Sequence, residues 1–128
     1  MIPLLFPFPA LPLILAALQH RINNLISLIA DDVIPESEET ETEMRDLNQA
    51  REAVEWATQS NRSELPRAVA VIIAEALQEY EEFVEGQIEA LDLDRHAVLH
   101  NADTGQPISH NMLWNLKLLN EVLSERLN

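Results

Sequence analysis

Apolar side chains recur along most of this chain at intervals of three and four residues, the spacing that places them on one face of an α-helix. The pattern begins near Pro12, which suits the first position of a helix, and Pro35 ends its first stretch. It predicts four helices, over residues 12–34, 37–60, 63–93 and 107–127. Because the connections are short, we expect an all-α fold, a four-helix bundle-like single domain that spans residues 1–128.

The predicted helices differ in how much apolar surface they must cover. The first is apolar over most of its circumference, which is typical of a helix in the middle of a bundle or at a subunit interface. The second has a thin apolar stripe, with Trp56 at its margin, and a wide charged face. The third and fourth carry fuller stripes. The residues that we expect to face inward from these two helices are Leu65, Val69, Ile72, Ile73, Ala76, Tyr80, Phe83, Ile88 and Leu91, then Met112, Leu116, Leu119, Leu123 and Leu127, with Leu113, Trp114 and Val122 beside them.

Polar residues and one glycine predict where the helices begin and where one of them weakens. Ser37 or Thr40 can cap the second helix, Thr40 together with Glu43 as a capping box. Ser63 is the N-cap that we expect for the third helix. Gly86 lies in the interior of that helix, where glycine costs about 1 kcal/mol relative to alanine, so we expect the helix to loosen there.

The first eighteen residues carry no polar side chain. That length is enough for a membrane span, but four prolines interrupt it, so a membrane-spanning helix is not expected. No basic residue precedes the run, so a secretory signal is not expected either. We expect residues 1–11 to form an extended, proline-rich apolar arm that packs on its own domain, on a neighbouring subunit or on a partner. The apolar surface that we assign to an oligomer or partner contact consists of Leu4, Phe6, Phe8, Leu11, Leu15, Leu18 and Ile22.

Charge is distributed unevenly along the chain. The formal net charge is −14, and residues 31–55 alone hold ten carboxylates against two arginines. Eight scattered basic residues cannot displace the counterions of a nucleic acid, so direct nucleic-acid binding is not expected, and an anionic membrane would repel the chain. A basic protein surface would attract it. The acidic face that we expect to bind such a partner comprises Glu38, Glu39, Glu41 and Glu43 of the second helix and Glu79, Glu82, Glu85 and Glu89 of the third.

Few residues offer catalytic or metal-binding chemistry. There is no cysteine, and two isolated glycines cannot build a phosphate-binding loop. Asp92, His96 and His100 would share one face of a continuous helix and could hold zinc. Residues 96–106 are rich in turn formers, however, and predict an irregular connection with a faint signal for a short hairpin. We therefore expect no metal site, no cofactor and no enzymatic activity.

These features favour a non-enzymatic acidic helical protein that binds a basic surface on a protein partner. Inhibitors, immunity proteins and chaperones act in this way, and rows of carboxylates can imitate the charge of a nucleic acid. The alternative is a structural subunit of a homo-oligomeric assembly, built through the apolar arm and the first helix. The absence of cysteine fits a reducing compartment, so we expect a cytoplasmic protein.

Overall fold

The computed structural model describes residues 4–5, 11–60, 64–92, 94, 96–101 and 104–127. Over these residues the chain forms four helices and two short pairs of antiparallel strands, which confirms the predicted all-α, bundle-like fold. The helices are α1 (Leu11–Ala30), α2 (Glu38–Gln59), α3 (Arg67–Leu91) and α4 (His110–Leu127). The strands are β1 (Leu4–Leu5), which pairs with β2 (Glu64–Leu65), and β3 (Leu99–His100), which pairs with β4 (Pro107–Ile108).

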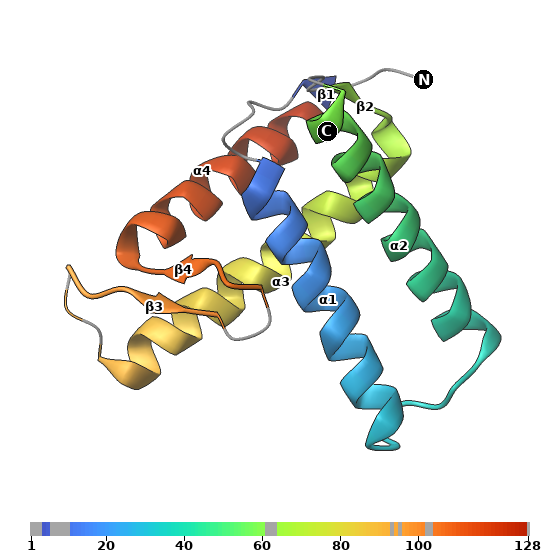
Figure 1. Cartoon of the computed structure of the whole chain (residues 1–128), viewed down its shortest axis with the longest axis horizontal. Coiled ribbons are helices and arrows are strands. Elements are labelled where there is room, and N and C mark those ends of the chain that lie inside the picture. The colour runs from blue at the N-terminus through green and yellow to red at the C-terminus, as the bar shows by residue number, and fades with distance from the viewer. Residues whose placement is uncertain are drawn as a thin grey trace.

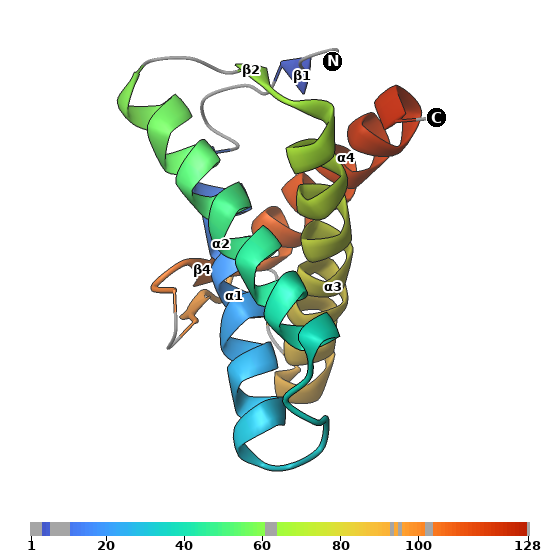
Figure 2. The same ribbon diagram turned by 90° about the vertical axis from the view of Figure 1, so that its right-hand side faces the viewer.

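α1, α2 and α3 pack on one another, and α4 contacts this group chiefly through α3. α1 and α2 lie side by side and run antiparallel, and α3 crosses behind them (Figure 1). α3 contacts both α1 and α2, whereas α4 packs chiefly against α3. The β1–β2 pair lies at the end of the molecule at which α3 begins (Figure 2).

α1 supplies the centre of the core. Seven of its residues are buried: Leu11, Ile14, Ala16, Ala17, Leu18, Ile22 and Leu25. Among the described residues it is also the one helix long and apolar enough to cross a membrane by length and composition. A core helix meets the same criterion, and α1 packs against α2 and α3 with these seven residues, although Ile26 on its outer side is 51% exposed.

The first helix ends at Ala30 rather than at residue 34, because the backbone turns left-handed at Asp32. Asp32 has φ 57°, and its N–H donates to the Ile29 carbonyl at 3.2 Å while the Val33 N–H donates to the Leu28 carbonyl at 2.9 Å. This pair of bonds is the Schellman arrangement, which satisfies the last carbonyls of a helix. The apolar spacing continued past this point, so it could not reveal the stop.

Ser37 is the N-cap of α2, as one of the two predicted alternatives had it. The capping box joins Ser37 to Thr40, whose Oγ1 accepts from the Ser37 N–H at 2.8 Å. The alternative box of Thr40 with Glu43 is wrong, because the Glu43 carboxylate binds Arg21 of α1 instead. The side chain of Glu43 is therefore available to join two helices.

The third helix starts later than predicted and is not interrupted. Its N-cap is Pro66, because Glu64 and Leu65 are paired with β1 in extended conformation. The predicted cap Ser63 lies outside the described residues. The helix continues through Gly86 without a break and ends where Asp92 adopts φ 48°.

α4 differs most from its predicted packing. Met112, Leu116, Leu119 and Leu123 are buried as expected. Trp114 and Val122 are 61% and 43% exposed, so the prediction that they widen the buried stripe of α4 is wrong. The prediction that Leu91 of α3 faces inward is also wrong, because Leu91 is 52% exposed. The faint hairpin signal corresponds to β3 and β4, held partly by the buried Asn101, whose N–H donates to the Gln106 carbonyl at 2.8 Å.

The two glycines provide a matched test of this backbone. A Cβ added at either Gly86 or Gly105 meets no atom within 4 Å, but Gly105 has φ +73° whereas Gly86 is helical. We expect Gly86→Ala to raise the free energy of unfolding by about 1 kcal/mol, because alanine favours helix. Gly105→Ala should lower it by about 1 kcal/mol, because alanine is strained at positive φ. Urea denaturation of the two variants measures both changes, and equal changes in stability would contradict the helical assignment at Gly86.

Candidate functional site

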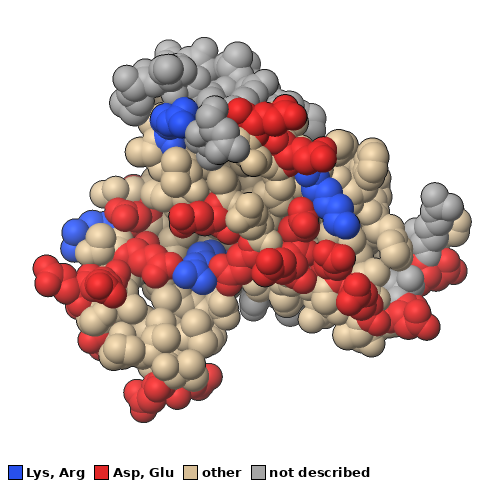
Figure 3. Space-filling model, turned by 180° about the vertical axis from the view of Figure 1, so that it is seen from behind, with Lys and Arg blue, Asp and Glu red and all other residues tan. Residues whose placement is uncertain are grey.

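A groove of about 640 Å³ opens between α2 and α3, with α1 at its base. Apolar side chains of α2 and α3, Leu47, Ile72 and Ala76, contribute to its lining. Acidic side chains gather across this face around a hollow (Figure 3). The carboxylates that line the groove are Glu38, Glu39, Glu43 and Asp46 from α2 and Glu75 and Glu79 from α3.

Helical spacing explains how the carboxylates form two rows. Glu39, Glu43 and Asp46 follow one another at intervals of four and three residues, so they lie along one edge of α2. Glu75 and Glu79 are four residues apart on α3. Because α2 and α3 both pack on α1, their acidic edges face the same groove.

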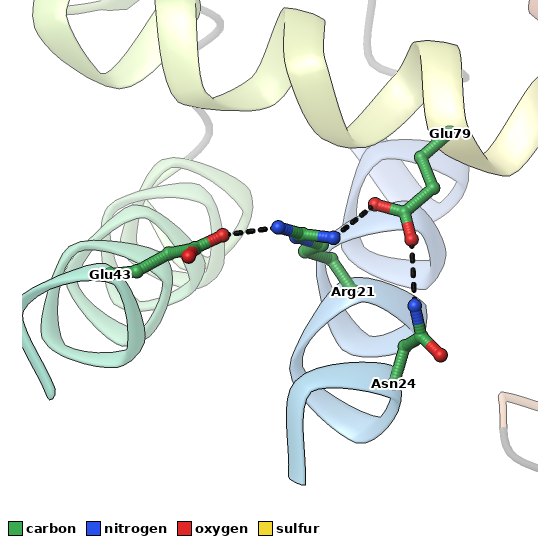
Figure 4. A network of polar contacts seen from close by, with 4 residues as sticks. All are labelled: Arg21, Asn24, Glu43 and Glu79. Carbon is green, nitrogen blue, oxygen red and sulfur yellow. Dashed lines mark hydrogen bonds and ion pairs between the residues drawn. The ribbon is translucent and has the colours of Figure 1, made fainter. Parts of the chain in front are cut away.

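One arginine joins the two rows. Arg21 of α1 donates through Nη2 to Glu43 and through Nη1 to Glu79, the latter at 2.9 Å. Asn24, one turn further along α1, donates to the other oxygen of Glu79 at 2.9 Å. Figure 4 shows the arrangement: Arg21 lies between Glu43 of α2 and Glu79 of α3, and Asn24 also donates to Glu79.

The surroundings of Arg21 keep it charged. Burial lowers the pKa of Arg21, but the hydrogen bonds and negative charges of Glu43 and Glu79 outweigh burial and raise the pKa above its ordinary value. The Arg21 side chain is 29% exposed. An ion pair in this position is screened less than one on the open surface and more than one in a dry core.

The remaining carboxylates of the groove leave its charge strongly negative. Among the described residues, Glu38, Glu39, Asp46 and Glu75 form no ion pair. The groove thus sets six carboxylates against one guanidinium. A hollow lined by one sign of charge concentrates the field and attracts counter-ions of the opposite sign.

The predicted acidic face divides between this groove and other surfaces. The structure brings together Glu38, Glu39, Glu43 and Glu79. Glu79 and Glu43 do not point outward as expected, because both bind Arg21. The other predicted residues, Glu41, Glu82, Glu85 and Glu89, lie elsewhere, and Glu82 lines a separate hollow between α3 and α4.

Three charged residues of the groove were not assigned to the acidic face from the sequence. Asp46 and Glu75 belong to its walls, and Arg21 joins them at the base. Arg21 carried a usable signal, since it is the only charged residue among the first thirty. A lone charge in an apolar helix needs a partner of opposite sign, but the sequence could not show which of 22 acidic residues would supply it.

The predicted apolar contact surface is largely internal. Leu11 and Leu18 are fully buried and Ile22 is 4% exposed, so their assignment to an oligomer or partner surface is corrected: they form the chain's own core. Leu15 is half-buried against that core. Leu4 belongs to β1, which pairs with β2 of the same chain. Phe6 and Phe8 lie outside the described residues.

The described residues contain no group of three histidine or acidic side chains arranged to hold a metal ion. α3 ends at Leu91 and His100 belongs to β3, so Asp92, His96 and His100 do not share a helical face.

Comparison of the chain with protein-family models, with curated proteins and with solved structures finds no match in any of the three.

The Arg21 network makes a prediction about stability. We expect Arg21→Gln to lower the free energy of unfolding by about 1–3 kcal/mol, because two neighbouring carboxylates then face each other without their shared donor. Arg45→Gln, at an exposed position of α2, removes the same charge and should change stability by less than about 0.5 kcal/mol.

A double-mutant cycle separates the ion pair from the rest of the arginine side chain. If Arg21 acts through Glu79, combining Arg21→Gln with Glu79→Gln should cost about 1 kcal/mol less than the two single changes together. Urea denaturation measures each corner of the cycle. Additive losses would show that Arg21 stabilises the helices by packing alone.

Proposed function

We propose that this chain is a non-enzymatic binding protein whose α2–α3 groove takes a lysine- and arginine-rich segment of a protein partner. The observation that carries the proposal is the lining of the groove, in which Glu38, Glu39, Asp46 and Glu75 remain without an ion pair among the described residues. These four carboxylates supply negative charge that Arg21 does not neutralise.

The shape of the groove favours an elongated basic segment. Neighbouring carboxylates within each row lie about one helical turn apart, roughly 5–6 Å between Cβ atoms. Basic side chains at positions i and i+4 of a partner helix have the same spacing. The apolar floor at Leu47, Ile72 and Ala76 can receive the aliphatic stems of lysine or arginine while their charged ends reach the carboxylates.

The Arg21 network supports binding without large rearrangement. Arg21 ties α1 to both α2 and α3, and a second contact, from Arg51 Nη1 to Gln19 Oε1 at 3.1 Å, ties α2 to α1 further along. The two walls of the groove are therefore fixed to a common base. A preformed site of this kind loses less entropy on binding than a flexible one.

An experiment with matched charge removal tests the proposal. The probe is a helical peptide with lysines at i, i+4 and i+7, and binding is measured by isothermal titration calorimetry. We expect Glu38→Gln, Glu39→Gln and Glu75→Gln together to weaken binding about tenfold, since each partly exposed ion pair contributes about 0.5 kcal/mol. Affinity for the peptide should also fall as salt rises.

The control removes the same charge elsewhere. Glu52→Gln, Glu55→Gln and Glu89→Gln change the net charge equally at exposed positions outside the groove. They should weaken peptide binding by less than about threefold, through long-range attraction alone. Equal weakening by both triple variants would mean that overall charge, and not the groove, attracts the peptide, and the proposal would fail.

A further inference from the structure

The outer face of α4 carries a row of exposed apolar side chains. Trp114, Leu118 and Val122 follow one another at intervals of four residues and are 61%, 42% and 43% exposed. The buried residues of α4, among them Leu116 and Leu123, lie on the opposite side of the helix. α4 therefore has an apolar face toward α3 and a second apolar face toward solvent, a pattern typical of a helix covered on both sides.

The outer face is held in a fixed position. Leu116 is fully buried in the core, and Asn120 donates to the Glu81 carboxylate of α3 at 3.0 Å and to the Leu77 carbonyl at 3.4 Å. Trp114 and Leu118 also line a hollow of about 880 Å³ beside α3. An exposed tryptophan next to a hollow on a fixed helix is typical of the centre of a protein interface.

Charge indicates what covers this face. α4 contains two basic residues, Lys117 and Arg126, and two acidic ones, Glu121 and Glu125, so its formal charge is zero. The net charge of −14 therefore lies entirely outside α4. α2 and α3 carry an excess of acidic residues, and Glu81 and Glu82 of α3 line the hollow beside Trp114. Two copies of this chain therefore repel each other less across α4 than across α2 or α3, whereas a strongly basic partner would be drawn to the acidic groove instead.

We propose that a second copy of this chain docks on the outer face of α4, with the two α4 helices antiparallel about a two-fold axis near Leu118. In this arrangement Trp114 of each copy lies opposite Val122 of the other. Lys117 and Glu121 lie on the same side of the row, so an antiparallel pair brings Lys117 of each copy close to Glu121 of the other. The same surface thus supplies both the apolar contact and its own opposite charges.

The closing experiment measures the molar mass of the full chain by sedimentation over a range of concentrations. Because the face is one helix wide, we expect a weak dimer with a dissociation constant on the order of 10 μM. Leu118→Glu should weaken dimerisation at least about tenfold, because it buries a charge at the two-fold axis. Trp114→Ala should weaken it too, because Trp114 belongs to the apolar contact. The control for Leu118→Glu is Ile26→Glu, at a 51% exposed position of α1, and the control for Trp114→Ala is Trp56→Ala, at a 54% exposed position of α2. The controls should leave the dimer unchanged, and circular dichroism should show the same helix content in every variant.

A charge exchange tests the orientation. Lys117→Glu should weaken the dimer about threefold to tenfold, because Glu121 of the other copy then faces a like charge. Adding Glu121→Lys to the same chain should restore it, because the exchanged pairs are again opposite. Salt screens both the repulsion between the acidic surfaces and the attraction between Lys117 and Glu121, so the variants are compared at one fixed salt concentration.

A chain that is monomeric at every concentration tested would overturn the proposal, and so would a dimer that Ile26→Glu breaks and Leu118→Glu does not. A dimer that the charge exchange fails to restore would overturn the antiparallel arrangement. These outcomes are independent of peptide binding in the α2–α3 groove, because none of the changed residues lines that groove.

Discussion

The burial of α1 is the constraint on which the rest of the structure depends. A helix whose apolar residues occupy most of its circumference can be shielded only if other helices pack on more than one of its sides. α2 has a narrow apolar edge and a wide acidic face, so covering α1 with it brings carboxylates close to the α1 surface. α3 does the same from its own side. The acidic groove therefore results from the way in which α2 and α3 cover α1. Arg21 offsets the repulsion between their carboxylates, because it pairs with one from each helix.

Periodicity was sufficient for the number, order and approximate extent of the helices, because each must present an apolar face to the core. It failed at helix ends, where backbone conformation decides. Asp32 and Asp92 both adopt a left-handed backbone conformation, and the presence of aspartate in a sequence does not predict that conformation. The start of α3 was also missed, since the pairing of Glu64 and Leu65 with β1 joins segments about sixty residues apart. A contact between distant segments leaves no periodic signal.

The sequence predicted the type of candidate site, an acidic surface, but not which residues form it. An acidic surface on the second and third helices followed from composition, and half of the predicted glutamates do line one groove. Which glutamates point inward depends on the angle at which α2 and α3 cross α1, and helical spacing on a single chain segment does not contain that angle. The same reason explains α4: its spacing allowed one broad apolar stripe, but its main neighbour α3 covers only part of that stripe and leaves Trp114 and Val122 in solvent.

The pairing of β1 with β2 affects the order in which the chain can fold. Leu4 and Leu5 precede α1, yet their hydrogen-bonding partners stand just before α3, after the whole α1–α2 hairpin. Closing so long a loop costs chain entropy that only a formed hairpin can reduce. During synthesis Leu4 and Leu5 can pair only after the roughly sixty residues up to Glu64 and Leu65 have been made. Leu4 and Leu5 therefore join the folded structure late, after the helices of the α1–α2 hairpin have packed on each other.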